Sequence, residues 1–305
     1  MTAPLPRPPV ALTIAGSDPS GGAGIQADLK TFSALGAFGT SVITALTAQS
    51  TTGVTDVHEV PVAHVRAQLE TLVADVRIDV VKVGMLASAP LVEVVHELLT
   101  TGPLAAAPVV LDPVMVSTSG SLLLAPDAVD AVRALLPRAD VVTPNVPEAG
   151  VLLDEPPAAA AADLPEQARR LRQLGARRVL LKGGHLFEGQ RVIDRFDDGV
   201  AQHEYIHARL PIDAHGTGDF AHAEMTITLL DVKASDAITI VTATRADRSM
   251  FSAVTGSPWE RLYSSSWATA KSRGRSSVVA ATTTSPRTAK VTRSARVVVV
   301  IAPNR

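Results

Sequence analysis

Short apolar segments alternate with helical patterns along most of the first 219 residues. The apolar segments are rich in Val, Ile and Leu, and we expect them to be strands at 10–15, 41–47, 80–83, 108–111, 141–143 and 178–181. Between them, apolar residues at helical spacing predict helices over 22–35, 62–73, 91–99, 128–136 and 165–174. Strands of this composition that alternate with helices predict an α/β fold whose parallel sheet is covered on both faces.

A distinctive residue or motif stands near the end of each predicted strand. These are Gly16-Ser17-Asp18, Gln49, Met85, Asp112, Asn145 and Lys182-Gly183-Gly184. The carboxyl ends of parallel strands meet at one edge of a sheet, and ligands of such sheets bind beyond that edge. We therefore predict a single composite site there.

Two glycine-rich segments each follow an apolar run and precede a predicted helix. The first is AGSDPSGGAGIQADLK at 15–30 and the second is DAHGTGD at 213–219. Such segments can direct backbone N–H groups at an anionic ligand. We interpret Gly216, Thr217 and Gly218 as a turn for a transferring phosphate, and Asp219 as the base for a substrate hydroxyl. Glycines and an Asp at a helix start are also an ordinary N-terminal cap.

Three further residues have chemistry suited to phosphate or metal. Lys182 offers a point charge for phosphate, although a lysine at a strand end can simply be solvated. Glu148 stands three residues beyond Asn145, a spacing that suits a helix cap, and a carboxylate there can also hold Mg²⁺ through water. Asp112 precedes Pro113 and either orients metal or water or closes a turn. Phosphoryl transfer needs positioning, charge neutralisation and a base, so these residues favour a small-molecule phosphotransferase.

Composition excludes several other classes. The chain has 305 residues, 46% of them hydrophobic, and no cysteine, which excludes disulfides, thiolate metal sites and thiol catalysis. A net charge of -2 gives no reason to expect nucleic acid or a membrane surface as partner. Residues 1–9 hold four prolines and no apolar core segment, so we expect a disordered N-terminus rather than a signal peptide. We expect a cytoplasmic protein.

The amino-acid composition of the chain changes after about residue 240. Acidic residues outnumber basic ones up to residue 219, basic residues outnumber acidic ones beyond it, and 241–305 is rich in Ser, Thr, Arg and Ala. We predict a folded domain over 10–240 and an atypical basic tail over 241–305 that is disordered or out of frame. A shift of reading frame near residues 220–240 is our hypothesis for this break. The closing run Val297–Ile301 could form an orphan strand.

Seven segments resemble, in order, those of the hydroxymethylpyrimidine/phosphomethylpyrimidine kinases of thiamine biosynthesis, within the ribokinase-like superfamily. They lie at 14–31, 44–50, 81–87, 111–115, 143–148, 181–185 and 215–218. The resemblance implies a three-layer ribokinase-like fold with a mainly parallel central sheet flanked by helices. It also implies ATP, Mg²⁺, a homodimer and two successive phosphorylations, first of 4-amino-5-hydroxymethyl-2-methylpyrimidine and then of its monophosphate.

The same resemblance implies roles for individual residues. The pyrimidine pocket would be formed by Gly16, Asp28, Gln49 and Met85. The nucleotide, its phosphates and the metal would be bound by Lys182, Asn145, Thr217, Asp112 and Glu148. The anion-binding turn and base would be Gly216, Thr217, Gly218 and Asp219.

The chain departs from the family pattern at two points. Asp219 stands where many members have cysteine, although Asp is the usual base of the wider superfamily. Beyond it, Phe220–Met225 continues a helical pattern only briefly, where the family continues with several helices. Three alternatives therefore stay open: a pyridoxal/pyridoxine kinase, a non-catalytic pyrimidine-binding module, and a catalytically impaired remnant.

Overall fold

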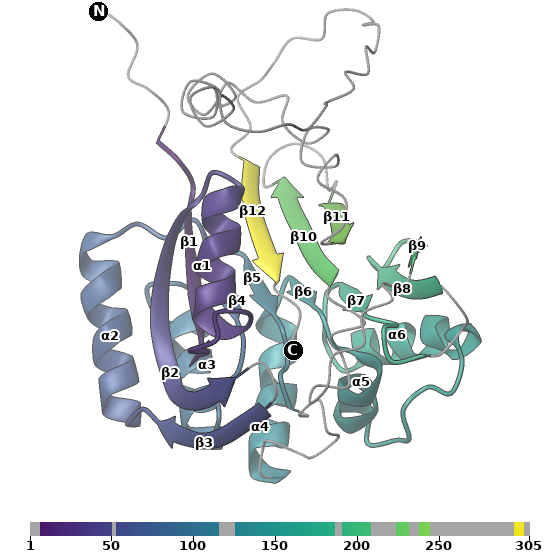
Figure 1. Ribbon diagram of the computed structural model, residues 1–305, viewed down its shortest axis with the longest axis horizontal. Coiled ribbons are helices and arrows are strands. Elements are labelled where there is room, and N and C mark those ends of the chain that lie inside the picture. The colour runs from purple at the N-terminus through teal and green to yellow at the C-terminus, as the bar shows by residue number, and fades with distance from the viewer. Residues whose placement is uncertain are drawn as a thin grey trace, which may run out of the picture.

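The computed structural model describes residues 7–50, 53–115, 126–186, 191–208, 224–231, 238–244 and 296–301. Within these residues the strands form two sheets (Figure 1). The larger one has nine strands in the order β3-β2-β1-β4-β5-β6-β7-β8-β9, and the smaller one has the order β11-β10-β12. The predicted turn at 216–219 lies outside the described residues.

The central part of the large sheet is parallel, as the sequence predicts. Its six parallel strands are β1 (Val10–Ser17), β2 (Phe38–Ser50), β4 (Val80–Val83), β5 (Val109–Leu111), β6 (Val141–Val142) and β7 (Val179–Leu181). All six predicted strands are confirmed, with ends that differ by a few residues.

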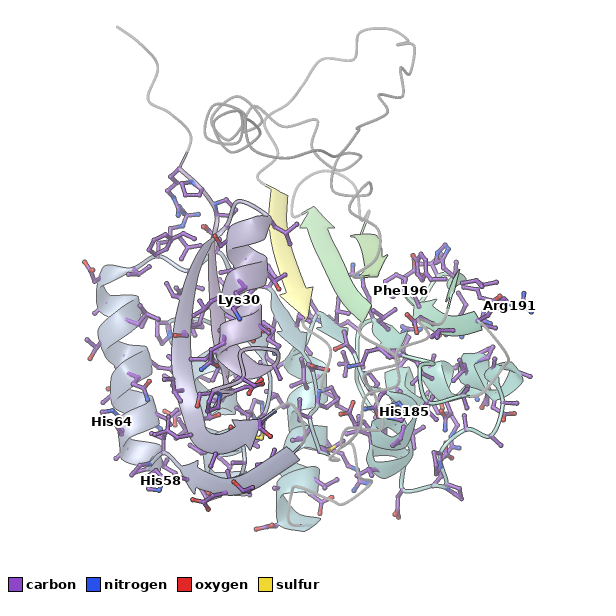
Figure 2. The ribbon with its side chains drawn as sticks, in the orientation of Figure 1. Lys30, His58, His64, His185, Arg191 and Phe196 are labelled. Carbon is purple, nitrogen blue, oxygen red and sulfur yellow. The ribbon has the colours of Figure 1, made fainter. Side chains whose placement is uncertain are left out.

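Three antiparallel strands toward the two ends of the sheet were not predicted: β3 (Gly53–Glu59), β8 (Arg191–Asp197) and β9 (Gln202–Ala208). Residues 54–59 of β3 are all exposed, so this strand has no apolar stripe, and His58 lies at the rim of the molecule (Figure 2). In β8 the buried positions alternate, but one of them is Asp194, which disguises the apolar period.

The helices cover both faces of the large sheet. They are α1 (Gly24–Ala34), α2 (Val62–Asp75), α3 (Ala89–Thr100), α4 (Pro126–Leu135), α5 (Val146–Leu153) and α6 (Leu164–Gln173), with short 3-10 turns at Leu136–Arg138 and Ala161–Asp163. Helices α2 to α6 pack each against the next, whereas α1 packs on β1 and β2 (Figure 1). Because strand–helix–strand connections are right-handed, the reversal of strand order at β1 places α1 on the opposite face from α3 and α4.

Local sequence explains where several helices begin and end. Asn145 and Glu148 form a reciprocal capping box at the start of α5, which confirms the predicted cap. Proline occupies the first turn of α3 and of α6, where no backbone N–H is needed. Gly36 follows α1 with a φ of 77°, which a residue with a side chain rarely adopts.

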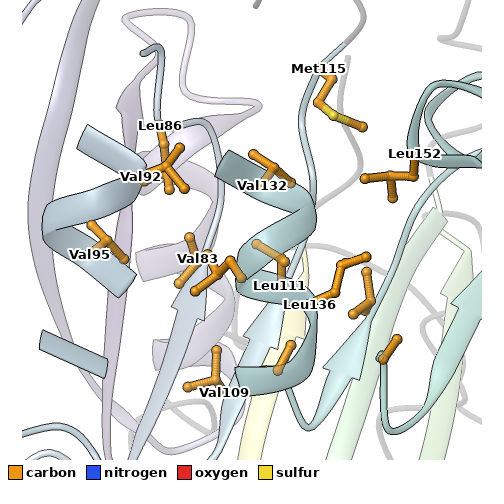
Figure 3. Packing of buried hydrophobic residues seen from close by; sticks show 14 of the residues in the cluster. Val83, Leu86, Val92, Val95, Val109, Leu111, Met115, Val132, Leu136 and Leu152 are labelled. Atoms are coloured by element: carbon orange, nitrogen blue, oxygen red, sulfur yellow. The ribbon is translucent and has the colours of Figure 1, made fainter. Parts of the chain in front are cut away.

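The main core lies between the large sheet and the layer of α2 to α6. Figure 3 shows Val83, Val109 and Leu111 of the sheet beside Val95 and Val132 of the helices. All five side chains are nearly or completely buried. Burial of a side chain of this size contributes about 1.5–3 kcal/mol, so this layer holds the strand ends of the site in place.

The small sheet corrects two expectations about the end of the chain. Glu224 and Met225, which we expected to continue a helix from Asp219, begin strand β10 (Glu224–Asp231). The closing valine run is a strand as predicted, β12 (Arg296–Ile301), but it is not an orphan, because it pairs with β10, which also pairs with β11 (Ile238–Thr244). Their Thr, Val and Ile residues favour strands over helices. Strand β12 contacts α1 and β4 (Figure 1).

Candidate active site

Polar side chains gather at the carboxyl edge of the parallel strands, in two groups. The first group surrounds the ends of β1, β2 and β4. The second lies at the ends of β5, β6 and β7. Strand order reverses at β1, which has β2 on one side and β4 on the other. This reversal is the switch point where open α/β sheets bind their ligands.

The loop after β1 is organised by the buried carboxylate of Asp18. It accepts hydrogen bonds from the backbone N–H groups of Ser20, Gly22 and Ala23 at 2.8, 2.9 and 2.7 Å. We expected this glycine-rich segment to present bare N–H groups to an anionic ligand. That expectation is wrong for these three groups, because an internal carboxylate already uses them. These hydrogen bonds instead fix the conformation of the loop at the end of β1.

Two glycines let this loop close tightly on the strand ends. Gly24 has a φ of 54°, and a Cβ there would lie 2.3 Å from the carbonyl oxygen of Gly16. A Cβ at Gly16 would in turn lie 2.7 Å from Cε of Met85. The structure therefore brings Gly16 and Met85 into contact, as expected for two residues of one pocket.

Gln49 lies beside the same strand ends. The Thr47 hydroxyl donates to the carbonyl oxygen of Ser17 at 2.8 Å and lies 3.2 Å from Oε1 of Gln49. The Thr44 hydroxyl donates to the carbonyl oxygen of Met85 at 2.6 Å. These hydroxyls tie the ends of β1, β2 and β4 together, so Gly16, Gln49 and Met85 share one corner of the sheet edge.

Asp28 lies beneath this corner rather than at its surface. Its Oδ2 accepts hydrogen bonds from the Thr13 hydroxyl at 2.6 Å and from Nζ of Lys82 at 2.9 Å. All three residues are buried. Sequence reasoning overlooked Lys82, although a lysine inside the buried strand Val80–Val83 is a signal, because buried lysines are almost always paired.

The second group is built around Asp112 and Lys182. Nζ of Lys182 donates to Oδ1 of Asp112 at 2.9 Å, and the Thr143 hydroxyl donates to the same oxygen at 3.1 Å. Glu148, completely buried, accepts a hydrogen bond on Oε2 from the backbone N–H of Asn145 at 2.8 Å. The Asn145 side chain is used in the helix cap, where it accepts from the N–H of Glu148. The structure thus gathers four of the predicted residues at the ends of β5, β6 and β7.

The electrostatics of this second group are unbalanced. Burial raises the pKa of Glu148 to about 8; the charge of Lys182 opposes this shift and the charge of Asp112 adds to it. Burial alone would lower the pKa of Lys182, but the carboxylates of Asp112 and Glu148 raise it above its usual value. Two carboxylates therefore face one lysine, and the group can accept a further positive charge.

The donor set of this group fits a hard cation. Oε1 of Glu148 is buried and lacks a hydrogen-bond partner in the part of the chain that the structure describes. Carboxylate oxygens are the ligands that Mg²⁺ prefers, often through water. Among the described residues, no three His, Asp or Glu side chains are close enough to form a complete metal cage. Glu148 and Asp112 thus suit an ion that keeps waters and phosphate oxygens as its other ligands.

A residue that sequence reasoning missed fixes the turn after Lys182. The buried carboxylate of Asp194 accepts a hydrogen bond from the backbone N–H of Gly183 at 2.8 Å. A Cβ at Gly183 would lie 1.9 Å from the carbonyl oxygen of Ile193, so only glycine fits. A charged residue at a buried position of a strand was the available signal. Gly216, Thr217, Gly218 and Asp219 lie outside the described residues.

The fold and the two groups define a class of protein. An α/β sheet with Gly16, Gln49 and Met85 at its switch point, beside a lysine and two carboxylates, suits a small-molecule kinase. Among the described residues, no helix has the length and apolar character needed to cross a bilayer.

Comparison with known proteins identifies the family. A model of the phosphomethylpyrimidine kinase family matches residues 18–245, and the chain belongs to that family. The hydroxymethylpyrimidine/phosphomethylpyrimidine kinase of Salmonella typhimurium is 54% identical over 180 residues, which are 59% of this chain and 67% of the relative. The matched range extends beyond our expected domain end at residue 240 and includes the predicted turn at 216–219.

Solved structures agree with this assignment. Phosphomethylpyrimidine kinase from Clostridium difficile is 38% identical with a TM-score of 0.59, covering 70% of this chain and 88% of that chain. The pyridoxal kinase of Bacillus subtilis, solved as an ADP complex, is 33% identical with a TM-score of 0.62. The match covers 70% of this chain and 82% of that chain. The predicted ribokinase-like α/β fold is confirmed.

Proposed function

We propose that this chain uses ATP to phosphorylate the hydroxymethyl group of 4-amino-5-hydroxymethyl-2-methylpyrimidine and then the resulting monophosphate, two steps of thiamine biosynthesis. The family match over residues 18–245 carries this proposal. The close grouping of Asp112, Glu148 and Lys182 at the sheet edge supports it, because phosphoryl transfer depends on positioning and on charge neutralisation.

In this proposal the corner at β1, β2 and β4 binds the pyrimidine. The Gln49 amide offers both a donor and an acceptor, which matches the edge of an aminopyrimidine. The thioether of Met85, already in contact with Gly16, packs against the ring. This corner orients the hydroxymethyl group toward the phosphates.

The second group binds the nucleotide phosphates. Lys182 supplies a positive charge to a transferring phosphoryl group, and Asn145 stands at the same strand ends. Glu148 and Asp112 would hold Mg²⁺, which neutralises charge on the phosphates when bound. The turn Gly216, Thr217 and Gly218 would add backbone N–H groups, and Asp219 would accept the proton of the attacking hydroxyl.

The test is ATP-dependent phosphorylation of the hydroxymethylpyrimidine by the purified full chain, followed as ADP release and as product mass. We expect both the monophosphate and the diphosphate. The matched control is Lys182→Met, which should bind the pyrimidine without turning it over. Wild-type protein that binds the pyrimidine but releases no ADP would instead support the impaired remnant or the binding module.

A pyridoxal/pyridoxine kinase is the second candidate, because the Bacillus subtilis pyridoxal kinase has a TM-score of 0.62 to this chain. Both substrates carry a hydroxymethyl group on a nitrogen heterocycle, so the same corner could orient either. The same assay with pyridoxine separates the two candidates. A higher kcat/KM on pyridoxine than on the hydroxymethylpyrimidine would overturn the first.

We also propose a cytoplasmic homodimer. Leu46, Val54 and Val57 on β2 and β3 are 46%, 49% and 45% exposed, and such apolar exposure on neighbouring strands favours a partner surface. Sedimentation of the purified chain tests the oligomeric state. A monomer at micromolar concentration would contradict the dimer without affecting the kinase proposal.

A further inference from the structure

We propose that Lys82 and Thr13 are positioning residues of the pyrimidine corner: together they hold Asp28 by Oδ2, so that Oδ1 is left to accept a hydrogen bond from the substrate. The substrate group would be an N–H or O–H donor on a small nitrogen heterocycle. This inference rests on the proposed function, and it adds the two residues that prepare Asp28 for that contact.

The hydrogen bonds of Asp28 are distributed unequally between its two oxygens. Oδ2 accepts from both the Thr13 hydroxyl and Nζ of Lys82, at 2.6 and 2.9 Å. Oδ1 is buried and has no partner in the part of the chain that the structure describes. The side chains of Lys82 and Asp28 are 5% and 0% exposed, so bulk water does not compensate. An unsatisfied buried acceptor is destabilising, and a donor on a bound ligand would remove that penalty.

The position of this trio links it to the corner above. Thr13 on β1 and Lys82 on β4 are register partners, two residues before Ala15 and Gly84. A Cβ at Gly84 would lie 2.9 Å from Nζ of Lys82, so the ammonium group presses against the backbone there. The next residue is Met85, which contacts Gly16. The trio therefore lies directly beneath the pair that shapes the pocket.

A purely structural role explains these contacts less well. A buried ion pair is weak evidence for stability, because apolar residues of similar volume often serve equally well. A pair that existed only to stabilise the core would also have no reason to leave one carboxylate oxygen unsatisfied. The arrangement is instead that of an acceptor held rigid before its donor arrives.

The experiment separates folding from binding with a double-variant design in the full chain. Lys82→Met alone leaves the Asp28 carboxylate buried and unpaired, so we expect a marked loss of thermal stability. Lys82→Met combined with Asp28→Asn removes both charges and should recover most of that stability. Calorimetric titration then gives the Kd for the hydroxymethylpyrimidine, for pyridoxine and for ATP.

We expect the double variant to bind the pyrimidine about tenfold more weakly than wild type, the loss of one good hydrogen bond, with its Kd for ATP unchanged. Thr13→Val keeps both charges and removes one hydrogen bond to Oδ2, so it should weaken pyrimidine binding by a smaller factor at nearly wild-type stability. The control is the Arg7–Asp79 ion pair, 2.8 Å apart, which precedes the amino ends of β1 and β4, at the opposite ends of these strands from the corner. Its double variant Arg7→Met and Asp79→Asn should leave both Kd values unchanged.

Three outcomes decide the matter. If the double variant, or Thr13→Val where the double variant does not fold, binds the ring with wild-type affinity, the trio is structural and the inference is wrong. If the wild type prefers pyridoxine, the proposed substrate is wrong, and the inference is then judged on pyridoxine affinity. A wild type that binds neither ring contradicts both proposals.

Discussion

The two polar groups of the sheet edge are built from the same residue types and differ in their charge balance. At β1 and β4, Lys82 meets one carboxylate, that of Asp28 on α1, and Thr13 is a second donor to it. At β5 to β7, Lys182 meets two carboxylates, and Glu148 keeps an unsatisfied oxygen. Their difference in function follows from that balance.

A balanced pair needs no further charge, so it can fix the geometry of a neutral ring. In the unbalanced group, burial raises the pKa of Glu148, and two carboxylates beside one lysine attract a cation, which suits a site for metal and phosphates. We therefore propose that the first group orients the substrate and that the second neutralises charge on the phosphates.

Lys182→Met should cause the largest loss. Removal of a group that stabilises transition-state charge typically lowers kcat by about 100- to 1000-fold. We expect a fall of that size, with the Kd for the pyrimidine unchanged. The control is Lys30→Met, because Lys30 on α1 donates to the carbonyl oxygen of Gly21 and has no proposed contact with the phosphates (Figure 2). A wild-type kcat for Lys182→Met would show that Lys182 does not stabilise charge during phosphoryl transfer.

Glu148 should make stability depend on pH in the absence of metal. Its pKa is about 8 in the folded chain and near 4.5 when unfolded, so between these values the folded state binds more protons. The free energy of unfolding should therefore be highest below about pH 4.5 for this group and fall as pH rises toward 8, by about 3 kcal/mol over the window from about pH 5.5 to 8.5.

Urea unfolding from pH 5.5 to 8.5 measures this slope. Glu148→Gln should flatten it, and Mg²⁺ should reduce the loss in the wild type at high pH by holding the carboxylate ionised. The matched control is Glu93→Gln on α3, which is exposed and should leave the slope as in the wild type. A wild-type slope in Glu148→Gln would show that Glu148 is not the titrating group.

Asp194→Ala should weaken ATP binding by a moderate factor, because the turn that aims Lys182 loses its hydrogen bond from Gly183. We expect the KM for ATP to rise about tenfold with a smaller change in kcat. Asp194→Asn keeps an acceptor oxygen and should recover most of this loss. If Asp194→Ala and the wild type have the same KM for ATP, Asp194 does not position Lys182.

Asn145→Ala should have the smallest effect on stability. It removes one half of the capping box at α5, and such losses are typically about 1 kcal/mol. Thermal unfolding with and without ATP checks this, and the ATP-induced shift also tests the proposed nucleotide contact. If ATP shifts the unfolding temperature of Asn145→Ala as much as that of the wild type, Asn145 caps the helix and does not contact the nucleotide.

The parallel strands were predictable because Val, Ile and Leu fill both faces of a buried sheet. Strands β3 and β8 were not, since residues 54–59 of the first are all exposed and the second buries Asp194. The carboxyl-edge site was predictable as a set of residues, because strand ends converge whatever the loop conformations. The hydrogen bonds from the loop N–H groups to the Asp18 carboxylate were not predictable, because hydrogen bonds within a loop depend on its three-dimensional path.

The partner of Lys82 could not be predicted from the sequence either. A lone lysine in an apolar strand signals a buried partner, but only the fold selects Asp28 over other carboxylates. The reading-frame hypothesis for the tail stays a prediction, and sequencing of the encoding DNA tests it.

The most direct test of the division between the two groups is one pair of calorimetric titrations with the hydroxymethylpyrimidine. The first uses Lys182→Met and the second uses the Lys82→Met, Asp28→Asn double variant. We predict wild-type affinity in the first and about tenfold weaker binding in the second. Equal losses in both variants would show that the two groups act as one, and would contradict the account.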